Sequence, residues 1–85
     1  MAISTGSKIK VVTGNLDYKL QDGMSGVVEE VTATGPEFFS IIVLVLNFGE
    51  GLRFTFWASG SELESDNPRL YGTDSIRSVT ITLNP

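Results

Sequence analysis

The chain is 85 residues long, which is enough for one small domain but not for two. It contains no cysteine and no histidine, so disulfides, thiolate metal sites and the commonest catalytic base are excluded. Six basic residues against ten acidic ones give a net charge of −4. This balance disfavours broad adhesion to nucleic acid or anionic membrane, but it leaves room for a local basic patch.

We expect a single domain over residues 1–85 with a flexible N-terminal segment at 1–7. A first strand is predicted at 8–12, where lysine alternates with aliphatic residues. A loop bracketed by glycines at 14–23 leads to a second strand predicted at 24–34. One face of this second strand is expected to carry Val27, Glu29, Val31 and Ala33.

Residues 38–48 form a near-continuous apolar run that ends in a glycine-bearing turn at 49–51. A strand with one face in water would alternate polar and apolar side chains, and this one does not. A small domain covers both faces of such a strand by curling its sheet into a barrel, by packing one face on another subunit, or by both. The run therefore indicates a barrel and self-association.

The fourth strand, predicted at 52–58, alternates cleanly. Its inward residues are Leu52, Phe54 and Phe56, and its outward residues are Arg53, Thr55 and Trp57. A polar loop at 59–74 is expected to hold one helical turn capped by Ser61, and a last strand is predicted at 75–83. We predict an all-β fold, a five-stranded, strongly bent antiparallel small barrel with at most one short helical turn.

The carboxylates do not form a convincing catalytic or metal site. Glu29 and Glu30 are adjacent on a strand, so they face opposite ways and cannot act on one substrate. The acidic group at 62–66 is better explained as a solvated loop than as a cation site. We predict no enzyme activity, no catalytic residue, no metal and no cofactor. No segment is typical of a signal peptide or a membrane span, so we expect a cytoplasmic protein.

Several basic and aromatic residues are candidates for nucleic-acid contact. Lys8 and Lys10 share one face of the first strand, either as a basic strip or as edge lysines that prevent unwanted strand pairing. Arg69, Tyr71 and Arg77 lie in and after the long loop, and arginine beside an aromatic ring suits base stacking and phosphate contact. The alternative is a loop that happens to carry two arginines. Trp57 is a further stacking candidate, or a subunit contact.

Short strands, glycine-punctuated hairpins and a long, bent apolar middle strand make residues 8–83 resemble the Sm-like small barrels, which share an SH3-like architecture. In particular, the chain resembles short, acidic Sm-like proteins attributed to marine cyanobacterial phages, which implies the cytoplasm of a host cell. The resemblance implies a homo-oligomeric ring of about five to seven subunits, in which the last two strands of neighbouring subunits pair edge to edge. It also implies binding of RNA, more than single-stranded DNA, at the pore. The residues expected to bind are first Phe38, Arg69 and Tyr71, and then Arg77, Lys8 and Lys10.

The alternative function is a structural or adaptor barrel of phage origin that binds protein. The acidic net charge favours it. So do differences from the Sm motifs, since the chain reads Arg69-Leu70-Tyr71-Gly72 where those proteins carry Arg-Gly after an apolar residue.

Overall fold

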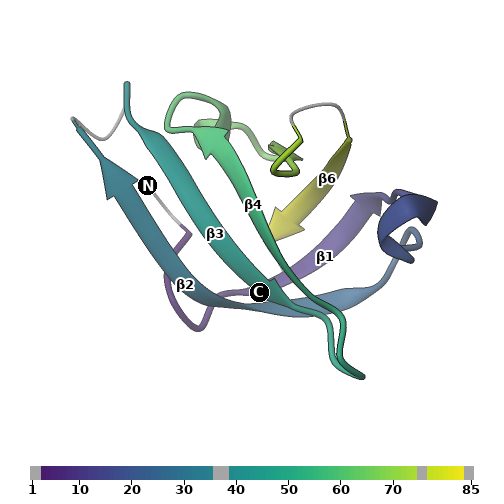
Figure 1. Ribbon diagram of the computed structural model, residues 1–85. Helices are drawn as coiled ribbons and strands as arrows, with labels where there is room; N and C mark the ends of the chain where they lie inside the picture. The colour runs from purple at the N-terminus through teal and green to yellow at the C-terminus, as the bar shows by residue number, and fades with distance from the viewer. Residues whose placement is uncertain (1–2, 36–38, 75–76, 84–85) are drawn as a thin grey trace.

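The computed structural model describes residues 3–35, 39–74 and 77–83 (Figure 1). Within these residues, six strands and two single-turn 3₁₀ helices follow in the order β1 (Lys8–Thr13), η1 (Leu16–Tyr18), β2 (Ser25–Thr34), β3 (Ile41–Asn47), β4 (Arg53–Ser59), η2 (Glu62–Glu64), β5 (Arg69–Tyr71) and β6 (Ser78–Leu83). Neighbouring strands are antiparallel, and β1 pairs with β6 to close the barrel. No helix in the described part of the chain is long and apolar enough to cross a membrane.

The predicted all-β barrel is confirmed, with one strand more than expected among the described residues. The extra strand, β5, lies in the segment predicted as a polar loop. It forms because Arg69, Leu70 and Tyr71 pair with Thr80, Val79 and Ser78 of β6. On its other side, β5 pairs with β4 only where Tyr71 meets Trp57.

Inward side chains of every strand fill the barrel. Together with Leu20 from the loop after η1, the largest fully buried side chains are Phe56, Ile9, Ile42, Leu44, Leu46, Leu70, Ile81, Val11, Val28 and Val79. Strand β3 alternates in burial although it is apolar throughout, because its even-numbered residues point inward. Its outward residues Ile41, Val43 and Val45, here called the β3 column, stay partly exposed. The apolar run therefore supplies half of its surface to the core and half to the exterior.

Strand β2 contains an irregularity that reverses the expected facing of its side chains. The register against β3 shifts between Val28 and Glu30, so Glu29 is an extra residue in the ladder. One extra residue changes the parity of a strand. Val28 is consequently fully buried and Val31 packs on the core, whereas Val27 is 41% exposed. The prediction that Val27 and Val31 share a face was wrong for this reason.

The loop between β1 and β2 holds a helical turn, η1, that the sequence did not predict. The Asn15 side chain accepts a hydrogen bond from the Asp17 backbone N–H and begins the turn. The turn delivers Tyr18 against the barrel, where its ring meets Phe54 and Phe56 edge-on, with centroid distances of 5.3 and 5.2 Å. This contact ties the loop to β4.

The other helical turn, η2, was predicted, but its capping residue is different. Ser61 makes no capping hydrogen bond with its side chain. Instead, the Ser59 hydroxyl accepts a hydrogen bond from the Glu62 backbone N–H at 3.1 Å. Ser59, the last residue of β4, is therefore also the residue whose side chain caps η2.

The N-terminal segment, expected to be flexible, is attached to β2 over its described residues. Ile3 is buried and belongs to the core. The Gly6 N–H donates to the Val28 carbonyl, and the Val28 N–H donates to the Ser7 carbonyl, at 2.8 and 2.9 Å. A single buried isoleucine and two backbone hydrogen bonds thus hold this segment.

Candidate nucleic-acid interface

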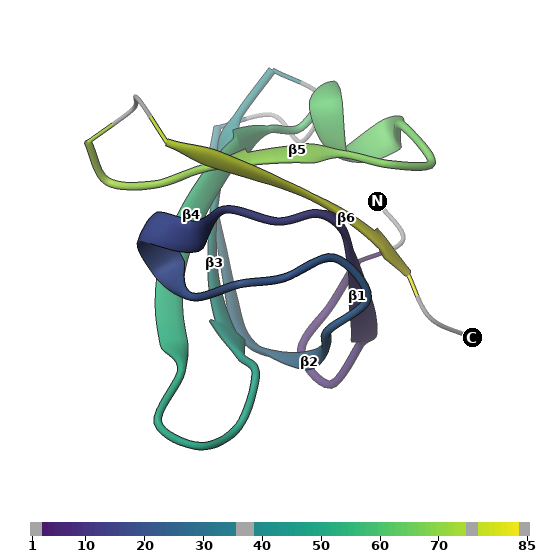
Figure 2. The ribbon, with the colours of Figure 1, turned by 90° about the vertical axis from the view of Figure 1, so that its right-hand side faces the viewer.

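Strands β5, β6 and β1 lie side by side on the barrel (Figure 2) and contain no acidic residue. Their inward residues, including Leu70, Val79 and Ile81, are buried. Apart from the exposed Val12 and Leu83, the side chains on their outer surface are cationic, aromatic or hydroxyl-bearing: Lys8, Lys10 and Thr13 on β1, Arg69 and Tyr71 on β5, and Ser78, Thr80 and Thr82 on β6. We call this set the cationic face.

Barrel closure brings the candidate residues together, because β6 lies between the two strands that carry them. Thr80 pairs with Arg69 on one side and Thr13 on the other, and Thr82 pairs with Lys10. Arg69 and Lys10 are thus two strands apart and offset by two residues, which places their backbones about 12 Å apart. Lys8 lies two residues before Lys10 on β1. Four of the six candidates from the sequence consequently share one surface.

Tyr71 forms part of an aromatic pair that extends this face onto β4. Its ring stacks on Trp57, with centroids 4.9 Å apart and planes 29° apart. The Trp57 indole Nε1 donates a hydrogen bond to the Gly72 carbonyl at 3.1 Å, which fixes the orientation of the indole. Both residues are half-buried, so part of each ring stays accessible for stacking.

Arg69 lies at the edge of a depression of about 310 Å³, which is lined by Glu62, Asn67, Arg69, Tyr71 and Thr80. A Glu62 carboxylate oxygen accepts a hydrogen bond from the Arg69 backbone N–H at 2.9 Å, so Glu62 is bound to the backbone. Among the described residues, the structure gives no ion pair to the side chains of Lys8, Lys10 or Arg69. These three cations are therefore available to an anionic ligand.

The remaining candidates do not join the face. Arg77 forms an ion pair with Asp74, with 2.6 Å between Nε and Oδ2, and its guanidinium lies 5.0 Å from the Tyr18 ring centroid. The hydrogen bond to Asp74 raises the pKa of Arg77. This side chain therefore holds its own loop against η1. Phe38 lies outside the described residues.

The hydroxyls of β6 are the part of the face that sequence reasoning missed. The sequence places Ser78, Thr80 and Thr82 on one side of the last strand, but it does not reveal that cationic strands flank them. In the described part of the chain, no cluster of three or more acidic residues is arranged to hold a metal ion.

Comparison of this chain with protein-family models, with curated proteins and with solved structures finds no match. The site's own chemistry must therefore indicate its function.

Proposed function

We propose that this protein is a ring-forming, Sm-like module that binds single-stranded nucleic acid, RNA more than DNA, through the cationic face. The observation that carries this proposal is the segregation of charge. Three cations to which the described residues give no ion pair lie on strands that contain no acid, in a chain whose net charge is −4. A local positive surface attracts phosphates even when the whole molecule is acidic.

Each kind of side chain on the face has a role in this binding. The backbones of Lys10 and Arg69 lie about 12 Å apart on either side of β6, and their side chains would contact different phosphates of one strand. The accessible part of Tyr71 would stack on a base, and base–aromatic stacking tolerates any sequence. The hydroxyls of Thr80 and Thr82 would contact phosphate or the ribose 2′-hydroxyl, the group by which proteins distinguish RNA from DNA.

Fluorescence anisotropy with labelled oligo-U and oligo-A, as RNA and as DNA, tests the proposal. Stacking on an aromatic ring is worth about 1–3 kcal/mol per base. We therefore expect Tyr71→Ala to weaken binding by about tenfold, and Arg69→Ala to weaken it and flatten its salt dependence. The control is Lys19→Asn, which removes one positive charge from the end of η1, at a residue that is not part of the face and has φ of 59°. Asparagine tolerates this backbone conformation.

Salt dependence gives a second measurement of the same contacts. Three cations per subunit limit the slope of log K against log salt to about −2 per bound subunit on a single strand. If Arg69→Ala and Tyr71→Ala together leave oligonucleotide affinity unchanged, the assignment of this face is wrong. If Lys19→Asn weakens binding as much as Arg69→Ala does, the binding reflects overall charge only.

The ring belongs to the proposal because the β3 column leaves apolar surface outside the barrel. Ile41 is 45% exposed, and Val43 and Val45 are half-buried beside it. The assembly edge expected at the last strand is already occupied, since β6 pairs with β1 and β5. Strand β4 pairs with β5 at Trp57 alone, so its residues 53–56 offer an edge to a neighbouring subunit. Light scattering after size-exclusion chromatography should give about five to seven chain masses.

The alternative proposal is an adaptor barrel that binds protein, and the same β3 column favours it. In a monomer, this column would stay exposed beside Thr32 and Thr34 of β2. Exposed apolar surface of this kind is typical of a protein contact. A clean monomer in solution that binds no oligonucleotide at low salt would favour the adaptor over the ring.

A further inference from the structure

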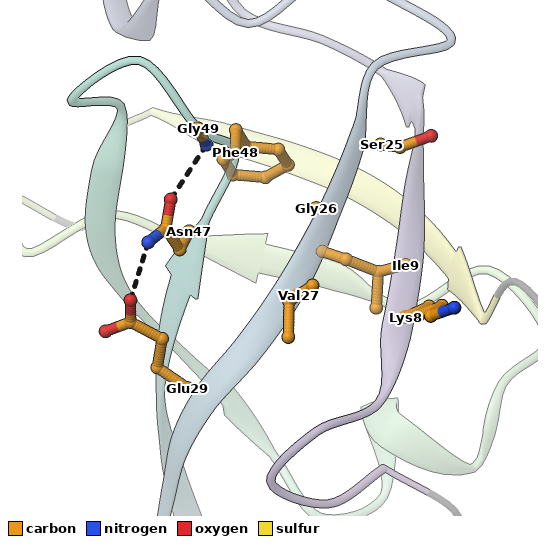
Figure 3. Close-up of a pocket in the computed structure, with 9 residues that line it drawn as sticks. All are labelled: Lys8, Ile9, Ser25, Gly26, Val27, Glu29, Asn47, Phe48 and Gly49. Carbon is orange, nitrogen blue, oxygen red and sulfur yellow. Dashed lines mark hydrogen bonds between the residues drawn. The ribbon is translucent and has the colours of Figure 1, made fainter.

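A second hollow, of about 500 Å³, lies where the start of β2 passes between β1 and the end of β3 (Figure 3). Its lining residues are Lys8, Ile9, Ser25, Gly26, Val27, Glu29, Asn47, Phe48 and Gly49. Its exposed hydrocarbon comes from Val27 and Phe48, because Ile9 is fully buried beneath them. We call the hollow the β1–β3 groove.

Gly26 keeps this groove open. A Cβ atom at residue 26 would lie 2.7 Å from Cδ1 of Phe48, so the phenyl ring rests directly against the glycine backbone. Any larger residue at this position would push the ring away from its seat. The groove therefore has an aromatic wall whose position depends on the absence of a side chain.

The polar groups on one side of the groove are already paired. Glu29 accepts hydrogen bonds from Asn47 Nδ2 at 2.6 Å and from Arg53 Nε at 2.5 Å, one on each carboxylate oxygen. Asn47 Oδ1 accepts from the Gly49 N–H at 2.7 Å. The hydrogen bonds from Arg53 and Asn47 lower the pKa of Glu29. Glu29 is thus an ionised carboxylate already neutralised by Arg53.

The opposite side offers groups without partners. Figure 3 shows Lys8 and Ser25 on the side of the groove away from Glu29 and Asn47. Among the described residues, the structure gives no ion pair to the Lys8 ammonium and no hydrogen bond to the Ser25 hydroxyl. As far as the structure describes the chain, the groove therefore has an apolar wall, the Lys8 ammonium without an ion pair at the β1 rim, and no unpaired carboxylate in its lining.

We propose that the β1–β3 groove binds a small amphipathic carboxylate of the medium-chain fatty-acid type. The hydrocarbon chain lies against Val27 and Phe48, and the carboxylate meets the Lys8 ammonium at the rim. The volume lies within the range of small-molecule sites. This inference goes beyond nucleic-acid binding and does not depend on it. Lys8 also belongs to the cationic face, so an occupied groove would remove one of its three cations.

Isothermal titration calorimetry of the full chain with hexanoate, octanoate and decanoate tests the groove. Burial of hydrocarbon predicts that affinity rises about twofold to fourfold per methylene. Lys8→Met should weaken decanoate binding by about threefold to fivefold, the value of an exposed ion pair, and should leave decanol binding unchanged. Lys10→Met is the matched control, because Lys10 lies two residues along the same strand and does not line the groove. It should change decanoate affinity by less than about twofold.

A second variant separates the groove from general binding to apolar surface. Val27 is 41% exposed, so Val27→Glu leaves the core intact and places a negative charge in the groove. We expect this variant to lose decanoate binding by more than about tenfold. Affinity independent of chain length, equal losses in Lys8→Met and Lys10→Met, or no binding of decanoate to the unmodified chain would each overturn the proposal.

Discussion

Replacement of Gly72 by alanine tests the contact between the segment after β5 and Tyr18 of η1, which packs on the barrel. Gly72 follows β5, and its carbonyl accepts the hydrogen bond from Trp57. It does not have a positive φ, so alanine introduces no backbone strain there. A Cβ atom at this position would nevertheless overlap the Tyr18 hydroxyl. Either the Tyr18 ring or the segment after β5 must move.

The cost follows from what Tyr18 contacts. Its ring makes edge-on contacts with Phe54 and Phe56, and each such pair is worth about 0.5–1.5 kcal/mol beyond the area that it buries. Displacement of the ring therefore costs about 1–3 kcal/mol, the usual range for overpacking. A loss of about 2 kcal/mol in a domain of this size lowers Tm by about 8–16 °C.

The assay is thermal and urea unfolding of Gly72→Ala, Tyr18→Phe and the double variant. Tyr18→Phe removes the overlapping hydroxyl, after which the nearest atom to the new Cβ is Cζ at 3.0 Å, a contact that a small ring shift relieves. We expect Tyr18→Phe to be nearly neutral and the double variant to recover most of the loss. An unchanged Tm in Gly72→Ala, or a double variant no more stable than Gly72→Ala, would refute this reasoning.

Three further predictions concern the core, a cap and an ion pair. Leu44→Ala, at a fully buried position, should lower the free energy of unfolding by about 2–5 kcal/mol in urea denaturation. Ser59→Ala should cost about 1 kcal/mol by removing the cap of η2, while Ser61→Ala should cost less than half of that; equal losses would contradict the cap assignment. The pKa of Glu29 is lower in the folded state than in the unfolded chain. Its contribution to the free energy of unfolding is therefore complete above the pKa of the unfolded chain, and it disappears as the pH falls through the pKa of the folded protein. Stability should therefore decline below about pH 4, and less steeply in Glu29→Gln.

Much of the barrel follows from local pattern. The alternation of Phe54 and Phe56 with Arg53 and Thr55 predicts strand β4 and its inward face. The facing of Val27 was wrong because the bulge at Glu29 depends on pairing with β3, which leaves no trace in the periodicity of β2 itself. Strand β5 was missed because three residues are too few to show a period of two.

In the candidate site, too, some contacts join residues that are close in the sequence and others join residues that are far apart. The ion pair between Asp74 and Arg77 is local, because its partners are only three residues apart in the sequence. The neighbourhood of Lys10 and Arg69 is not local. It exists because Thr80 and Thr82, near the other end of the chain, pair with strands on both sides. Sequence reasoning therefore identified four residues of the face without showing that they are neighbours.

The distribution of charge follows from the requirements of a closed barrel. Every strand of such a barrel has an outer face, and β2 carries the two acidic residues that occur in strands, Glu29 and Glu30. In the described part of the chain, the other acidic residues lie in the two 3₁₀ turns and in loops. Of the four strand cations, Arg53 is neutralised by Glu29, which leaves β1 and β5 with the unpaired ones. Under the proposed function, an acidic body with one basic face would direct a polyanion to that face, so the net charge would restrict where a nucleic acid could bind.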